Sequence, residues 1–146
     1  MQAATGVQHA HRNGVVHADI NPSNIFITDA HEIKLLDFGV ARYTNIPPHP
    51  DDVRFTWVTR TYASPEVLSG LPPVVEDDVF SLACVAYRLL SGKHPFGGTL
   101  SLVAMRKGFV VEAIPGLPSE EWEILRRALS YGRSDRPSAR WRHAVG

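Results

Sequence analysis

Three oxygen-bearing side chains in the first 40 residues could together bind a metal ion and a phosphate group. Asn24 precedes the apolar run 25–27, and Asp37 follows a second apolar run at 33–36. Antiparallel pairing of the two runs places Asn24 and Asp37 at one end of a hairpin, with Asp19 just upstream. Carboxylate and amide oxygens are hard ligands, suited to Mg²⁺ held together with substrate phosphates. The spacing leaves one alternative open, in which these polar residues only cap strand ends and turns.

Apolar periodicity locates the elements that must position these side chains. Residues 1–12 read as the end of a helix, and a turn at 28–31 separates the two apolar runs of the hairpin. Apolar residues recur at helical spacing from 76 to 91, and Gly92 then supplies the residue type that favours a helix C-terminus. This pattern predicts a long central helix.

The remaining segments carry weaker signals. Residues 41–66 lack periodicity and contain several prolines, which predicts a long irregular loop of a kind that is often functional. C-terminal helices are predicted within 119–145, the first capped by Ser119 and the second beginning near Pro137. Together these elements predict a mainly α fold with a small β-hairpin.

Composition limits the function classes. The 146 residues carry 15 basic and 15 acidic side chains, so no global field favours nucleic acid or an anionic membrane. The single cysteine, Cys84, excludes a disulfide framework and fits a reducing compartment. No apolar run approaches the ~18 residues of a membrane helix. The prediction is a cytoplasmic globular chain of one domain that contacts neither nucleic acid nor a membrane.

An ordered set of short motifs resembles the protein kinase family. Residues 17–24, HADINPSN, are similar to the kinase catalytic loop, and residues 37–39, DFG, match the magnesium-binding tripeptide. Residues 63–66, ASPE, resemble the Ala-Pro-Glu element that closes the activation segment. Residues 78–96 and 136–138 are similar to the family's central helix with its following turn and to its late arginine motif. Each motif alone is a weak signal, but their order and intervals together favour a serine/threonine protein kinase.

The resemblance implies a fold and a division of the chain. It corresponds to the C-terminal lobe of a kinase, an α+β unit, with the N-terminal lobe absent. Neither the glycine-rich loop nor the lysine strand that covers the ATP phosphates is found, so ATP would have half of its site. The chain, 1–146, is then a single lobe with these parts: catalytic loop 17–24, magnesium tripeptide 37–39, activation segment 37–66, central helix 76–91 and C-terminal helices 119–145.

Carried over position by position, the resemblance assigns the chemistry, with ATP and Mg²⁺ as cofactors. Asp19 is implied to be the catalytic base that accepts the proton of the substrate hydroxyl. Asn24 and Asp37 are implied to bind the Mg²⁺ ions that bridge the phosphates of ATP. Phe26 would line the floor under adenine. Asn21 occupies the catalytic-loop position where serine/threonine kinases carry a lysine.

The resemblance also implies a set of residues that support the site. Asp78 would hold the catalytic loop through its backbone amides. Glu66 would form a partly buried ion pair with Arg136 and so tie the activation segment to the lobe. The others are His17, which would orient the catalytic loop, Gly39 of the tripeptide, and Thr59, which would contact that loop.

Two departures from the family pattern bear on activity. Ala18 replaces an arginine that usually pairs with a phosphorylated activation-loop residue, so phosphorylation of that segment is not expected to be the switch. Asn21 replaces a lysine whose charge meets the transferring phosphate, and losing one such donor costs about 2.7–4 kcal/mol, or 10²–10³ in rate. A neutral hydrogen bond from Asn21 to phosphate remains open, which predicts weakened rather than abolished activity.

The leading interpretation is the catalytic lobe of a serine/threonine protein kinase that transfers the ATP γ-phosphate to a protein hydroxyl. Its partners would be a protein substrate with a Ser or Thr hydroxyl and a missing or separate N-terminal lobe. That lobe would sit on an exposed apolar and acidic shelf bearing Phe26, Asn24 and Asp37. Two alternatives stay open: a non-catalytic pseudokinase-like interaction module or truncated remnant, and a small-molecule phosphotransferase of kinase-like fold.

Overall fold

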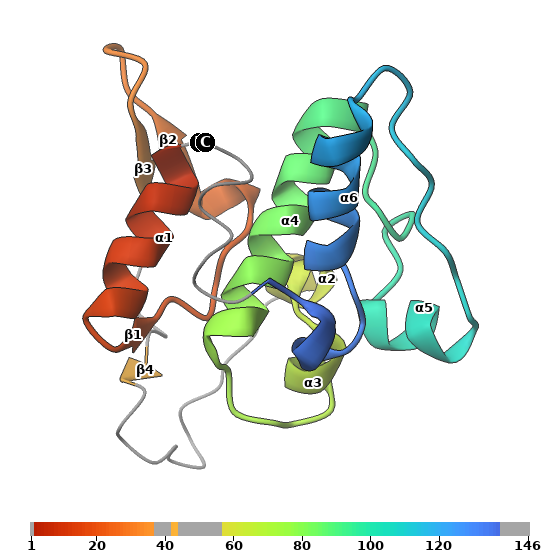
Figure 1. The fold of residues 1–146 in the computed structure, drawn as a ribbon. Coiled ribbons are helices and arrows are strands. Elements are labelled where there is room, and N and C mark those ends of the chain that lie inside the picture. Colours follow the sequence, from red (N-terminus) through yellow and green to blue (C-terminus); the bar gives the residue numbers. More distant parts are fainter. Residues whose placement is uncertain (1, 37–41, 44–56, 138–146) are drawn as a thin grey trace.

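Helices dominate the chain, and small antiparallel sheets flank them (Figure 1). The computed structural model describes residues 2–36, 42–43 and 57–137. In chain order the elements are α1 (Gln2–Arg12), β1 (Val15–Val16), η1 (Pro22–Asn24), β2 (Ile25–Ile27), β3 (Ile33–Leu35), β4 (Arg42–Tyr43), α2 (Trp57–Tyr62), α3 (Pro65–Leu68), α4 (Val75–Ser91), α5 (Ser101–Arg106), α6 (Ser119–Ala128) and η2 (Arg133–Asp135). Among these described helices, none has both the length and the apolar character needed to cross a bilayer. The predicted mainly α fold with a small hairpin is confirmed.

The hairpin joins the two apolar runs that the sequence singles out. β2 and β3 pair antiparallel, with Ile25 opposite Leu35. The N–H of Leu36 donates to the carbonyl of Asn24 at 2.8 Å, which extends the pairing by one residue. The main chains of Asn24 and Leu36 therefore adjoin at the open end of the hairpin, next to the predicted site.

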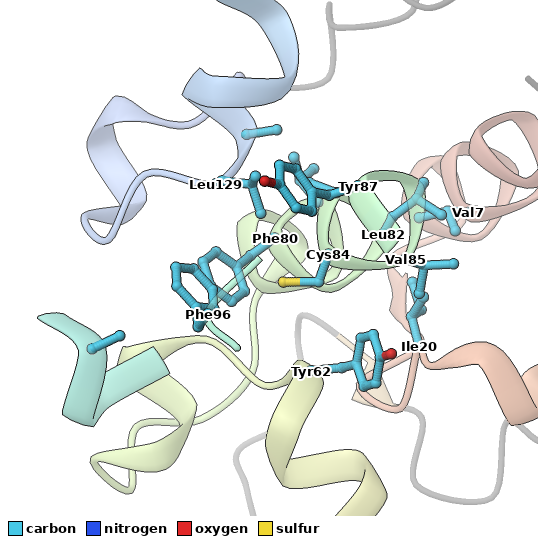
Figure 2. Packing of buried hydrophobic residues seen from close by; sticks show 14 of the residues in the cluster. Val7, Ile20, Tyr62, Phe80, Leu82, Cys84, Val85, Tyr87, Phe96 and Leu129 are labelled. Carbon is cyan, nitrogen blue, oxygen red and sulfur yellow. The ribbon is translucent and has the colours of Figure 1, made fainter. Parts of the chain in front are cut away.

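The helix α4 is the buried axis of the molecule. Figure 1 shows α1 and the hairpin on one side of it and α6 on the other. Its apolar side chains, such as Phe80 and Leu82, belong to one buried cluster with residues of other elements, including Val7 of α1 and Leu129 after α6 (Figure 2). Burial of each large side chain contributes about 1.5–3 kcal/mol. Residues 17 and 18, just before Asp19, bond to this buried helix through Asp78.

Both ends of α4 follow from local chemistry. The acidic residues Glu76, Asp77 and Asp78 occupy its first turn, where the helix dipole favours negative charge. At the other end Gly92 adopts a left-handed φ of 73°, a conformation that costs glycine little. The helix therefore begins at Val75 and ends at Ser91, against the sequence-based range of 76–91.

Several sequence-based expectations about the secondary structure are wrong. The segment 41–66 is not wholly irregular, because α2 and the short strand β4, which pairs with β1, lie within it. The helix α5 is not predicted at all. Ser119 is the first residue of α6 rather than its cap, and the capping position is Pro118. Most of the second predicted C-terminal helix falls on residues 138–146, outside the described residues.

The physical reason for these errors is helix length. α2 and α5 have six residues each. Isolated helices this short are unstable, because closing the first turn costs more than one hydrogen bond returns. Tertiary contacts therefore decide whether they form, and a single sequence does not reveal such contacts.

Candidate active site

The carboxylate of Asp19 is held by two amide side chains of its own loop. Nδ2 of Asn21 donates to Oδ1 of Asp19 at 3.1 Å, and Nδ2 of Asn24 donates to Oδ2 at 3.1 Å. The same two nitrogens also donate to the backbone carbonyl of Asp19, at 3.1 Å and 2.8 Å. Each carboxylate oxygen therefore has a neutral donor, which orients the group without neutralising its charge.

Asn21 is built into the loop rather than directed outward. Its side chain is only 3% exposed, and its Oδ1 accepts the N–H of Ser23 at 2.9 Å, which caps η1. Pro22, which has no N–H to satisfy, is the first residue of that turn. Nδ2 of Asn21 donates to both the backbone carbonyl and the carboxylate of Asp19. The expected hydrogen bond from Asn21 to a phosphate is therefore not available in this conformation.

Asn24 offers an oxygen suited to a metal ion. Its Nδ2 is committed to Asp19, which fixes the orientation of the amide. Within the described ranges no donor bonds to its Oδ1. Such an amide oxygen fits Mg²⁺, which prefers oxygen ligands. Asp37, the second predicted ligand, and Gly39 of the same tripeptide lie outside the described residues. In the part of the chain that is described, no three His, Cys, Asp or Glu side chains converge as a metal site.

His17 connects the catalytic loop to the end of β3. Its Nδ1 accepts the N–H of Asp19 at 3.1 Å, so the ring proton lies on Nε2. Nε2 in turn donates to the carbonyl of Leu36 at 3.0 Å. The ring is fully buried. It therefore fixes the backbone of Asp19 relative to the strand that leads into Asp37.

The buried carboxylate of Asp78 joins the loop to α4. Its Oδ2 accepts the backbone N–H of His17 at 2.8 Å, and its Oδ1 accepts that of Ala18 at 2.9 Å. Nε2 of His11, on α1, lies 2.8 Å from Oδ2. Ala18 has a left-handed φ of 65°, a conformation that costs a non-glycine residue about 1–2 kcal/mol. The bonds to Asp78 help to hold this strained residue in place.

The hairpin next to the loop carries exposed apolar side chains on both of its faces, because successive residues of a strand point to opposite sides. Phe26 is 56% exposed, Ile27 64% and Leu36 45%. The exposure of Phe26 matches the apolar part of the expected shelf. Thr59 lies on α2, and its side chain is outside the described residues.

Glu66 and Arg136 form an ion pair. Nη2 of Arg136 lies 2.5 Å from Oε1 of Glu66, and the arginine side chain is 0% exposed against 15% for the glutamate. The guanidinium also stacks over the ring of Phe80, with 4.8 Å between Cζ and the ring centroid. Nε and Nη2 donate to the carbonyls of Ser130 and Tyr131. The buried arginine is thus fully paired, as a buried charge must be.

This pair belongs to a larger network than the sequence predicts. Asp77 lies 3.3 Å from Nη1 of Arg136 and 2.7 Å from Nη2 of Arg133. The hydroxyl of Ser64 donates to Oδ1 of Asp77 at 2.6 Å. Two carboxylates therefore face two guanidinium groups, and the network ties α3, α4 and the segment after α6 together.

Sequence reasoning assigned no role to four polar residues that the structure shows joining distant elements: His11, Ser64, Asp77 and His94. Two signals were present. Ser64 stands where the family element has alanine, and Asp77 is a second acid immediately before Asp78. Their partners are far apart along the chain, so neither signal alone identifies a contact.

A family model and curated relatives that match this chain are all protein kinases. Residues 1–143 match the family model described as "Protein kinase domain". The chain is 34% identical over 143 residues to serine/threonine-protein kinase PkaB of Streptomyces coelicolor, which covers 91% of this chain and 34% of the relative. It is 33% identical over 141 residues to serine/threonine-protein kinase PknA of Mycobacterium tuberculosis, covering 97% of this chain and 32% of the relative. The chain therefore spans about a third of the length of these curated relatives.

Proposed function

Because the chain belongs to the protein kinase family, we propose that it carries the phosphoryl-transfer site of a serine/threonine protein kinase. The observation that carries this proposal is the Asp19 carboxylate, which Asn21 and Asn24 hold at both oxygens. A general base must present its oxygen in a fixed position to the hydroxyl that it deprotonates. The half-buried, doubly oriented carboxylate meets that requirement.

Asp19 performs the proton transfer in this mechanism. Its carboxylate accepts a hydrogen bond from a Ser or Thr hydroxyl of the protein substrate and takes the proton as the hydroxyl oxygen bonds to the γ-phosphorus of ATP. The bond from that phosphorus to the oxygen bridging it to the β-phosphate breaks, and ADP leaves with the electron pair. The proton then passes from Asp19 to solvent. His17 and Asp78 keep the backbone of the loop in place throughout.

Asn24 and Asp37 are the residues that would hold Mg²⁺, which neutralises charge on the ATP phosphates when it is bound. Asn24 supports this assignment because its Oδ1 lacks a donor among the described residues while its Nδ2 is anchored to Asp19. Phe26 would provide an apolar floor for adenine, and its exposure supports that role.

The partners follow from the same surfaces. The face of the hairpin that bears Phe26 would receive a kinase N-terminal lobe, either from a longer chain or as a separate one. The second partner is a protein substrate with a Ser or Thr hydroxyl. A cytoplasmic location remains a prediction, and the free, buried Cys84 is in keeping with a reducing compartment.

One observation favours a second candidate function, a non-catalytic interaction module. Asn21 stands in the lysine position, and its amide turns inward to Asp19. The loop therefore offers no cation from this position to the transferring phosphate, and the expected cost is about 10²–10³ in rate.

A substrate comparison tests the proposal. The chain, with a kinase N-terminal lobe supplied separately, is incubated with labelled ATP and Mg²⁺, and with either a Ser/Thr-rich protein or a set of small alcohols. We expect label on the protein, and none when Mg²⁺ is chelated. Label on an alcohol alone would indicate a small-molecule phosphotransferase. No label on any acceptor would favour the interaction module.

A further inference from the structure

Three consecutive carbonyls at the C-terminal end of α2 and just after it are each bound by a side chain from elsewhere. Nε2 of His94 donates to the Thr61 carbonyl at 2.7 Å. Ser81 on α4 and Ser101 on α5 donate through their hydroxyls to the next two carbonyls, those of Tyr62 and Ala63, each at 2.7 Å. Helix C-termini leave such carbonyls without intrahelical partners, so these donors fix the end of α2. We call the three donors the carbonyl clamp.

His94 differs from the two serines because its other ring nitrogen is also bound. Nδ1 accepts the N–H of Phe96 at 3.1 Å and the N–H of Gly98 at 3.1 Å. Gly97 and Gly98 have left-handed φ values of 62° and 81°, which turn the loop back toward the ring. The imidazole therefore joins the loop 94–98 to α2 through both of its nitrogens, and only the neutral ring with its proton on Nε2 can do so.

The surroundings of the ring favour this neutral form. Burial lowers the pKa of His94, and the positive charge of Arg88 lowers it further, against an opposing contribution from the bond to Thr61. Arg88, on α4, donates to the hydroxyl of Tyr62 at 3.0 Å. The ring of Tyr62 itself meets the imidazole edge-on, with 5.3 Å between centroids. Among the residues that the structure describes, Arg88 and Tyr62 are thus the charged and titratable groups of the packed helices shown to interact with His94.

We propose that His94 is a positioning residue, which holds the end of the activation segment against the loop 94–98 while its ring is neutral and releases that loop when the ring is protonated. A protonated Nδ1 would point an N–H at the two N–H groups that it now accepts from. The serines of the clamp do not titrate, so His94 is its only member that responds to pH near neutrality. The functional part of the inference rests on the proposed kinase activity, because α2 carries Thr59, which is predicted to contact the catalytic loop.

The direction of the pH effect follows from the lowered pKa. A base whose pKa is lower in the folded protein than its ordinary value of about 6.5 stabilises the fold in its neutral form. The stabilisation is fully present above about pH 6.5 and is lost as the pH falls through the lowered folded-state value. Acid therefore weakens the attachment of the loop.

Two substitutions separate the bonds of the ring. His94→Asn places an amide oxygen near the position of Nδ1, so it keeps an acceptor for the two N–H groups but does not reach Thr61. His94→Gln reaches toward Thr61 with its amide nitrogen and loses the acceptor for the loop. Neither side chain titrates. Both variants keep every other histidine, so they are matched controls for the wild-type chain.

The test is amide hydrogen exchange at Phe96 and Gly98 in the full 146-residue chain between pH 7.5 and 5, corrected for intrinsic rates. In the wild type, local opening should increase by up to about tenfold per pH unit below pH 6.5. The His94→Asn chain should show a flat profile, and the His94→Gln chain should exchange rapidly at every pH. An identical pH profile in the wild type and His94→Asn would overturn the proposal.

A kinetic readout then tests the functional part. As the pH falls, the KM for the protein substrate should rise more in the wild type than in His94→Asn, while the KM for ATP changes equally in both. Equal changes in the KM for protein would overturn the positioning role. Absence of transfer in all three chains would overturn the proposed kinase function alone, because the exchange measurement requires no catalysis.

Discussion

Two residues close to Asp19 along the chain, Ala18 and Asn21, shape its loop in different ways. Asn21 donates to the carboxylate of Asp19 and caps η1, so it orients the proposed base. Ala18 lies in a left-handed conformation that aims its N–H at Asp78. Both positions differ from the common kinase pattern: at Asn21 the bonds come from the side chain itself, whereas at Ala18 the bond to Asp78 comes from the backbone.

Removing the side chain of Asn21 should lower both stability and transfer rate. Asn21→Ala loses the cap of η1, which should lower the free energy of unfolding by about 0.5–2 kcal/mol. It also leaves Oδ1 of Asp19 without this donor, which should slow transfer about tenfold. Asn21→Ser is the matched control, because its hydroxyl can accept from Ser23 but is too short to hold Asp19. It should recover stability but not rate; recovery of both would contradict the role assigned to Asn21.

Replacing Ala18 by glycine should stabilise the protein. The left-handed conformation costs alanine about 1–2 kcal/mol, and glycine avoids this cost but loses about 0.5–1 kcal/mol of backbone entropy on folding. The expected net gain in the free energy of unfolding, measured in urea, is about 0–1.5 kcal/mol, with a midpoint of about 0.75. Ala10→Gly within α1 is the control and should destabilise by about 1 kcal/mol. A loss of stability in both variants would show that Ala18 is not strained.

At the scale of elements, the charge network joins segments that no single helix could hold together. Glu66 of α3, Asp77 of α4 and two arginines from the segment after α6 meet at one place. Ser64, at the start of α3, also accepts the N–H of Val67 at 3.3 Å while it donates to Asp77. Residues 61–64 are thereby attached to α4 through Asp77 and to the three donors of the carbonyl clamp.

Neutralising Glu66 should lower the stability of the protein because its partner, Arg136, is buried. Glu66→Gln leaves the guanidinium of Arg136 without its main carboxylate, and breaking a buried pair costs about 3–5 kcal/mol. Asp77 remains beside the arginine and should keep the loss near the lower end of that range. Urea unfolding of the variant measures it.

The control for this prediction is Glu123→Gln, which breaks the exposed pair between Glu123 and Arg126. Solvent screens the charges of this exposed pair, so no measurable change in the free energy of unfolding is expected. If both substitutions lowered the free energy of unfolding equally, the buried network would contribute no more to stability than the exposed pair.

For the whole molecule, the sequence predicts structure best where an apolar periodicity is long or where several motifs occur in a fixed order. The 17 residues of α4 give a periodicity that packing does not override, and the kinase motifs occur in the right order. The six-residue helices α2 and α5 give no such signal, because their stability depends on contacts that the chain makes only after folding.

The site was predictable in its residue types but not in its bonds. The convergence of Asp19 and Asn24 follows from the loop and hairpin, whereas the inward turn of Asn21 depends on rotamers that no motif specifies. The clamp bond from His94 to Thr61 spans 33 residues and the bond from Ser64 to Asp77 spans 13. Such pairings depend on how whole elements pack, so they require the structure.

The most direct test of the central claim is the rate of phosphoryl transfer to protein after substitution of Asp19. Single-turnover rates are measured for the wild type, Asp19→Asn and Asp29→Asn, each with the same supplied N-terminal lobe. Asp29 is an exposed acid in the hairpin turn and serves as the control. Loss of the base should slow Asp19→Asn by about 10²–10⁴-fold, while Asp29→Asn keeps the wild-type rate. Transfer by Asp19→Asn at the wild-type rate would contradict the account.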